Sequence, residues 1–119
     1  MNRELKFRVY SFVCEEFIYF DIYDYPQGIA GGVSEPQQFT GLKDKNGNEI
    51  YEGDILQFFD EDKGNEPCEV IYELGMFGCN IIDTSNNKDF WQLYYIVTKL
   101  KPIVIGNIFE NPKMRGIYE

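Results

Sequence analysis

Carboxylates are the side chains of this sequence that could do chemistry. The chain has 20 Asp and Glu residues among its 119 and no histidine. It therefore lacks the usual general base at neutral pH, the usual activator of a serine or cysteine nucleophile, and the imidazole ligand of a metal ion. Acid–base catalysis or the binding of a hard cation would depend on Asp and Glu.

Two groups of carboxylates are close together in the sequence. The first group is the run Asp60, Glu61 and Asp62. This run lacks the spacing and the closing Glu of a calcium-binding loop, so we interpret it as a solvated loop. The second group, Glu52 and Asp54, flanks Gly53, and it is placed to accept backbone hydrogen bonds in a tight turn. We therefore predict no cofactor, no metal and no enzymatic activity.

The cysteines and the apolar segments bear on where the protein works. The chain has three cysteines, Cys14, Cys68 and Cys79, which is an odd number, and no two of them form a C-x-x-C pair. We therefore expect separate thiols in a reducing compartment. Each cysteine is expected to be a small residue of the core. No apolar run approaches the roughly 18 residues that span a bilayer, and the first residues lack the apolar core of a secretory signal. These features predict a cytoplasmic protein that does not enter membranes.

The net charge of −9 argues against nucleic acid as a direct partner, because phosphate binding depends on Lys and Arg. The basic residues near the end, Lys99, Lys101, Lys113 and Arg115, are too sparse for such a surface. Acidity fits a basic protein partner. A nucleic-acid-related role, through an SH3-like barrel face or by acidic mimicry of nucleic acid, stays open as an alternative.

Aromatic residues make up 17% of the chain, which favours strands and can also supply an interaction surface. Trp91, Tyr94 and Tyr95 form one aromatic group that is either a binding hot spot or part of the core. Together with the acidic run 60–62, they are our candidate interaction residues. We also consider self-association, because small aromatic β domains can pair.

An N-terminal strand pair is predicted from two patterns. Residues 5–10 alternate apolar and polar side chains, which indicates a half-buried strand, and residues 17–23 are extended and aromatic. The nearby acids are expected to line a sheet edge, where charge discourages unwanted pairing. These acids are Glu15, Glu16, Asp21 and Asp24. Pro26 and a glycine-rich loop then end the pair.

The rest of the chain predicts a small, partly open β-barrel. Further strands are expected at residues 37–42, 55–59, 69–74, 79–82 and 103–109. The Asn46-Gly47 pair marks a tight turn, and residues 89–99 fit either a strand or the short helix that we favour. We predict one mainly β domain, with a strand pair and a Gly-rich loop in residues 1–36. Residues 37–119 form its barrel-like core, which is SH3-like in the C-terminal half.

Two segments carry a family resemblance. Residues 39–55 and residues 104–112 resemble the two hallmark segments of the YopX-like family of small bacteriophage and prophage proteins, and residues 5–10 resemble its usual opening. The shared positions suggest turns and strands and not catalysis: Thr40, Gly41, Leu42, Asp44, Gly47, Tyr51, Glu52, Gly53, Asp54, Gly106, Asn107, Asn111 and Pro112. The resemblance implies a phage or prophage origin in a bacterial host, and it transfers no activity. The expected function is therefore that of a non-enzymatic accessory protein that binds another, unidentified protein.

Overall fold

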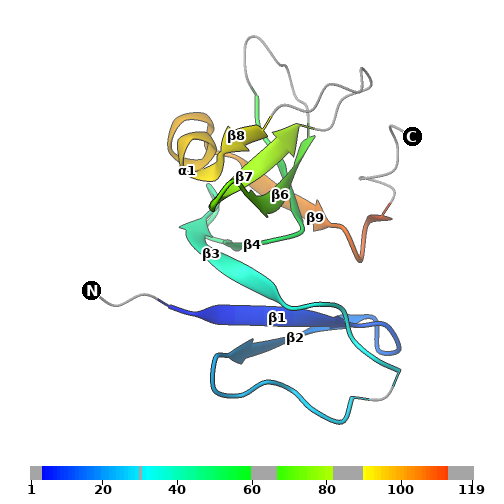
Figure 1. Cartoon of the computed structure of the whole chain (residues 1–119). Coiled ribbons are helices and arrows are strands. Elements are labelled where there is room, and N and C mark those ends of the chain that lie inside the picture. Colours follow the sequence, from blue (N-terminus) through cyan, green and yellow to red (C-terminus); the bar gives the residue numbers. More distant parts are fainter. Residues whose placement is uncertain (1–3, 30, 60–66, 82–89, 113–119) are drawn as a thin grey trace.

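The fold is mainly β, as predicted. We describe it from a computed structural model over residues 4–29, 31–59, 67–81 and 90–112. The N-terminal sheet has the order β2-β1-β3-β4, and the second sheet has the order β8-β7-β6-β5-β9 (Figure 1). The strands are β1 (Lys6–Ser11), β2 (Glu16–Asp21), β3 (Gln37–Lys43), β4 (Glu49–Tyr51), β5 (Asp54–Gln57), β6 (Pro67–Glu73), β7 (Met76–Ile81), β8 (Phe90–Gln92) and β9 (Ile103–Asn107).

Strand β1 is covered on both sides, so the prediction of a half-buried strand is wrong. Arg8 and Tyr10 are as well buried as Val9 between them. The β4–β5 turn covers β1 at Arg8, which binds Glu52 and Asp54. Phe109 covers β1 at Tyr10. In Figure 1 the segment between β2 and β3 runs on the far side of β2 from β1. A polar–apolar alternation cannot reveal the second covering layer, because that layer comes from distant parts of the chain.

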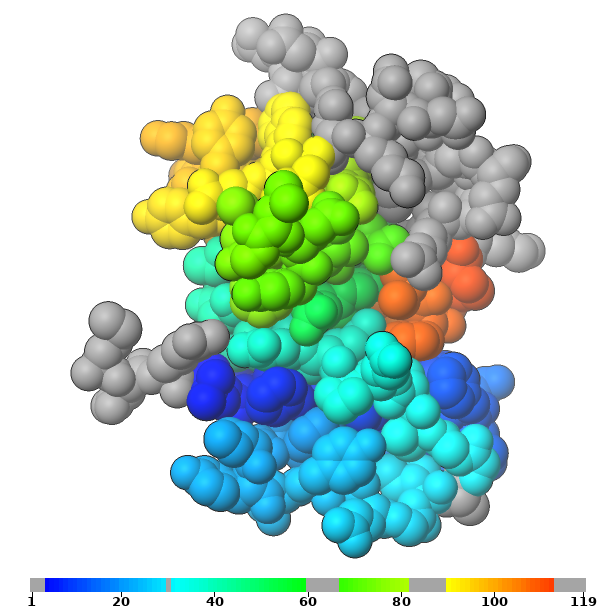
Figure 2. Space-filling model, viewed as in Figure 1, coloured from blue at the N-terminus to red at the C-terminus, as the bar shows by residue number. Residues whose placement is uncertain are grey.

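The second sheet forms a half-barrel. Strands β5, β6 and β7 follow one another as an antiparallel meander, and β9 returns to pair with the free side of β5. Four of the predicted strands, those at residues 55–59, 69–74, 79–82 and 103–109, therefore lie side by side, while the fifth, at residues 37–42, belongs to the N-terminal sheet. The N-terminal residues pack directly beneath this half-barrel (Figure 2).

Residues 90–100 combine both structures that the sequence left open. Strand β8 pairs with β7, and it is followed at once by α1 (Leu93–Tyr95) and the π-helical turn η1 (Ile96–Leu100). Leu93 and Ile96 are fully buried, so the helical part closes one end of the half-barrel. No helix in the described ranges is long and apolar enough to cross a membrane.

The main core lies inside the half-barrel. It consists of Ile50, Leu56, Phe58, Cys68, Val70, Cys79, Ile81, Leu93 and Ile96. These side chains come from β4 through to η1, so the core links segments that are far apart in sequence. The N-terminal hairpin contributes none of them and needs another means of attachment.

Candidate functional site

A buried arginine attaches the N-terminal hairpin to the half-barrel. Only 4% of the surface of Arg8 is exposed, and its Nη2 lies 2.7 Å from Oδ1 of Asp54 in an ion pair. The same guanidinium donates hydrogen bonds to the Gln37 side chain (2.8 Å) and to the backbone carbonyl of Glu52 (3.2 Å). Arg8 therefore joins β1 to β3 and to the turn before β5.

Aromatic rings enclose this ion pair. The guanidinium carbon lies 4.0 Å from the ring centroid of Phe17 and 4.7 Å from that of Tyr51, which are cation–π distances. The backbone N–H of Tyr51 donates to the second oxygen of Asp54 at 2.8 Å. Burial raises the pKa of the Asp54 carboxyl, while the Arg8 charge acts in the opposite direction. The pair is a structural lock, because no buried side-chain nitrogen or oxygen atom in the described part of the chain lacks a hydrogen-bond partner.

Sequence reasoning missed Arg8 as a key residue. It placed Arg8 on the polar side of a half-buried strand, and it assigned Asp54 only to a local turn. Gly53 fits that turn as expected: its φ is +85°, and a Cβ atom there would collide with the Gln37 side chain. One feature of the sequence could have indicated that this side of the strand is buried. Tyr10 lies on the same side as Arg8, and its side chain is mostly apolar.

The two hallmark segments meet in space. Asp44 accepts hydrogen bonds from the backbone of Asn46 and Asn48 in its own turn and from the N–H of Val104, 60 residues away. Burial by itself would raise the pKa of Asp44, but these hydrogen bonds lower it overall. Asp44 thus fastens the β3–β4 turn to β9.

The second hallmark ends in a capped turn that reaches the hairpin. The Asn107 side chain accepts hydrogen bonds from the N–H groups of Phe109 and Glu110, and Asn111 accepts one from the N–H of Asn107. The ring of Phe109 then stacks on Tyr10 with centroids 5.2 Å apart. The hallmark residues therefore hold the turns and the hairpin in place.

The hairpin carries an unusual share of exposed apolar surface. Half of the large hydrophobic side chains that are exposed in the described residues belong to a set that we call the hairpin rim: Phe12, Val13, Tyr19, Ile22, Tyr23 and Tyr25. The stretch of sequence that carries them, residues 9–42, contains five acids and no Lys or Arg, while Lys6 and Arg8 of β1 lie opposite Asp21 and Tyr19 of β2. An aromatic surface with an excess of one sign of charge is typical of a binding surface for a protein of opposite charge.

The predicted aromatic group is only partly assembled. Trp91 is half-buried against the core, with its ring 6.1 Å from Phe58 and 6.0 Å from Tyr95. Tyr94 is exposed, and within the described part of the chain it has no ring contact with Trp91 or Tyr95. Trp91 therefore serves mainly as a core residue. The acidic run 60–62, Lys113 and Arg115 lie outside the described residues.

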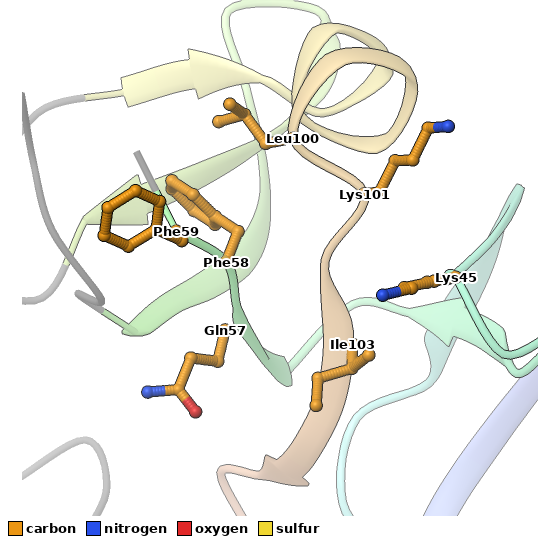
Figure 3. A pocket seen from close by; sticks show the side chains of 7 residues that line it. All are labelled: Lys45, Gln57, Phe58, Phe59, Leu100, Lys101 and Ile103. Atoms are coloured by element: carbon orange, nitrogen blue, oxygen red, sulfur yellow. The ribbon is translucent and has the colours of Figure 1, made fainter. Parts of the chain in front are cut away.

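A second candidate is a pocket of about 360 Å³ beside β9 (Figure 3). Its walls include Lys45 from the β3–β4 turn, Lys101 after η1, and Phe59, which is 65% exposed. Lysines and an exposed aromatic ring are the groups that contact single-stranded nucleic acid. The sequence did not bring Lys45 and Lys101 together, because they are distant along the chain.

The structure corrects the expectation that the three cysteines are separate thiols, each buried in the core. Cys68 on β6 and Cys79 on β7 form a disulfide across the hairpin, with Cα atoms 5.5 Å apart, whereas Cys14 is free and exposed. Spacing alone did not predict this pair, because it depends on the register that sets Cys68 opposite Ile81 and Val70 opposite Cys79. A disulfide removes the support that the cysteine count gave to a reducing compartment.

Comparisons with known proteins agree with this fold. A family model described as YopX protein matches residues 33–114, more than half of the chain. The crystal structure of protein EF1440 from Enterococcus faecalis is similar, with a TM-score of 0.62 and 26% sequence identity. The alignment covers 96% of this chain and 99% of that chain. Among curated proteins, no sequence matches.

Proposed function

This chain belongs to the YopX protein family, and from that premise we propose that it is a non-enzymatic protein that binds another protein through its N-terminal hairpin. The observation that carries the proposal is the hairpin rim, whose exposed aromatic side chains belong to a stretch of sequence, residues 9–42, with five acids and no Lys or Arg. Monomeric proteins seldom keep such apolar surface without a use for it. The partner that fits is a protein with a basic surface.

The position of the hairpin supports this proposal. The family match begins at residue 33, so the hairpin lies before the matched region and is free to carry a specificity of its own. The Arg8 lock holds it rigidly on the half-barrel, which limits the entropy lost on binding.

We extend the proposal to origin and architecture. A phage or prophage origin, and action in the cytoplasm of the bacterial host, follow from the family resemblance. The meander of β5 to β8, closed by β9 on β5, supports an SH3-like relationship for the half-barrel.

We expect the double variant Phe12→Ser/Tyr23→Ser to bind the partner protein much more weakly than the wild type does. These two rim side chains are 53% and 87% exposed, so their removal takes away contact area. The Phe12 ring also contacts Tyr10 and Phe109, so thermal denaturation of the variant checks that the fold is retained. The measurement is quantitative mass spectrometry of host proteins retained by the immobilised wild type and by the variant. A partner with a basic surface should be retained by the wild type and reduced at least about tenfold on the variant, as expected for the loss of a hot spot.

The matched control is Tyr72→Ser/Leu74→Ser. It removes two exposed apolar side chains from the β6–β7 hairpin, away from the rim, and it should retain the partner like the wild type. Equal retention by all three proteins, or loss only in the control, contradicts the proposal.

A nucleic-acid role is the second candidate, and the pocket with Lys45 and Lys101 is the observation that favours it. Trp91 is the one tryptophan of the chain and contacts Phe58 in the pocket wall, so its fluorescence reports on this site.

Under our main proposal we expect no retardation of single-stranded DNA in a gel shift at low salt and no change in Trp91 fluorescence. The reason is that the net charge of −9 opposes phosphate binding. Retardation that Lys45→Ala/Lys101→Ala abolishes would establish the second candidate instead.

A further inference from the structure

We propose that the outer edge of β2 pairs with an extended segment of the partner protein that is apolar in its middle and basic at both ends. This inference rests on the proposed function and names the partner of the same hairpin. Three observations lead to it: the position of β2 in its sheet, the distribution of the rim along β2, and the acids at its two ends.

Strand β2 is an edge strand. It is the last strand of its sheet and pairs with β1 over six residue pairs, from Lys6–Asp21 to Ser11–Glu16. In Figure 1 the segment between β2 and β3 runs on this side of β2, and among the described residues neither it nor any other segment except β1 forms a ladder with β2. An edge strand presents a row of unpaired backbone N–H and C=O groups, which can receive one more strand.

The rim residues follow this edge from end to end. Phe12 and Val13 lie in the turn before β2, Tyr19 lies within it, and Ile22 and Tyr23 follow directly after it. Six residues of strand span about 20 Å. A ligand that contacts the rim at both ends must therefore be long and narrow, which describes an extended segment better than a helix or a small molecule.

The acids select against a second copy of this chain. Glu15 and Glu16 lie at one end of β2, and Asp21 and Asp24 lie at the other. If two copies paired antiparallel through β2, the two Glu residues of each copy would lie beside the two Asp residues of the other copy. This contact between acids would occur at both ends of the paired strands. Parallel pairing in register would place each carboxylate beside its own equivalent. Both arrangements are repulsive, whereas a segment with Lys or Arg at its two ends is attracted in either direction.

The test uses a synthetic peptide of alternating Val and Thr with two lysines at each end. Its binding to the full ¹⁵N-labelled chain is followed by NMR, which also measures amide exchange. We expect chemical-shift changes over residues 12–25 and slower exchange of β2 amides. A copy of the peptide with N-methyl groups on alternate residues, which cannot complete the ladder, should bind much more weakly.

Charge reversal gives the matched variant. Glu16→Lys/Asp24→Lys changes two exposed side chains and should bind the lysine-ended peptide on the order of tenfold more weakly, while it gains affinity for a glutamate-ended peptide. Equal binding of the N-methylated peptide, shift changes outside the hairpin, or dimerisation of the free chain through β2 would each overturn the inference. A partner that is lost on Phe12→Ser/Tyr23→Ser while no peptide protects β2 would overturn the edge pairing and leave the proposed function intact.

Discussion

Arg8→Met should lower the free energy of unfolding by about 3–5 kcal/mol, as expected when one partner of a buried ion pair is removed. The variant leaves the Asp54 carboxylate buried without its counter-charge and takes a donor from Gln37 and from the Glu52 carbonyl. It also removes a cation that lies over two aromatic rings. Chemical denaturation at neutral pH measures the loss, which is a large share of the total stability of a small domain.

Two further variants distinguish the effect of breaking the buried Arg8–Asp54 ion pair from the effect of removing any positive charge from β1. Lys6→Met removes the neighbouring, more exposed cation of β1 and should change stability by no more than about 1 kcal/mol. Arg8→Met/Asp54→Asn removes both buried charges and should recover a substantial part of the loss. An Arg8→Met protein that unfolds within about 1 kcal/mol of the wild type would show that the buried pair does not hold the hairpin.

Asp44→Ala should cost about 3 kcal/mol at neutral pH, because several hydrogen bonds to a charged acceptor are lost together. One of them comes from the Val104 N–H, so β9 loses one attachment to the β3–β4 turn, while the hydrogen bond from the Lys45 N–H to the Pro102 carbonyl remains. Denaturation of the variant is compared with that of Asp24→Asn, a change at an exposed acid that should leave stability almost unaffected.

The contribution of Asp44 should also depend on pH. Its pKa is lower in the folded protein than the value of about 3.9 in an unfolded chain. The stabilisation is therefore fully present above about pH 4 and is lost as the pH falls through the folded pKa. The difference between wild type and Asp44→Ala should shrink between about pH 4 and pH 2. A difference that stays constant over this range would mean that the carboxylate charge is not what holds the turn.

The two hallmark segments show how far local sequence signals reach. The Asn46-Gly47 turn and the Glu52–Asp54 turn were predictable, since glycine with positive φ and a nearby Asp have a local cause. That Asp44 also binds Val104 was not predictable, because 60 residues of chain separate the two groups. For the same reason, the sequence could not predict that Lys45 and Lys101 line one pocket.

By itself, the sequence determined the mainly β class, most of the strands, the turn residues and the family, because these depend on side-chain alternation and on backbone preferences of a few neighbouring residues. Only the tertiary structure decided which polar side chains are buried, which cysteines pair and which aromatic residues stay exposed. The structure shows that Arg8 forms a buried ion pair with Asp54 and that Cys68 forms a disulfide with Cys79. It also shows that the hairpin rim is exposed, and we therefore choose the rim rather than Trp91 as the candidate surface. Burial and pairing depend on which distant segments cover a residue, and that is set by the packing of the whole chain.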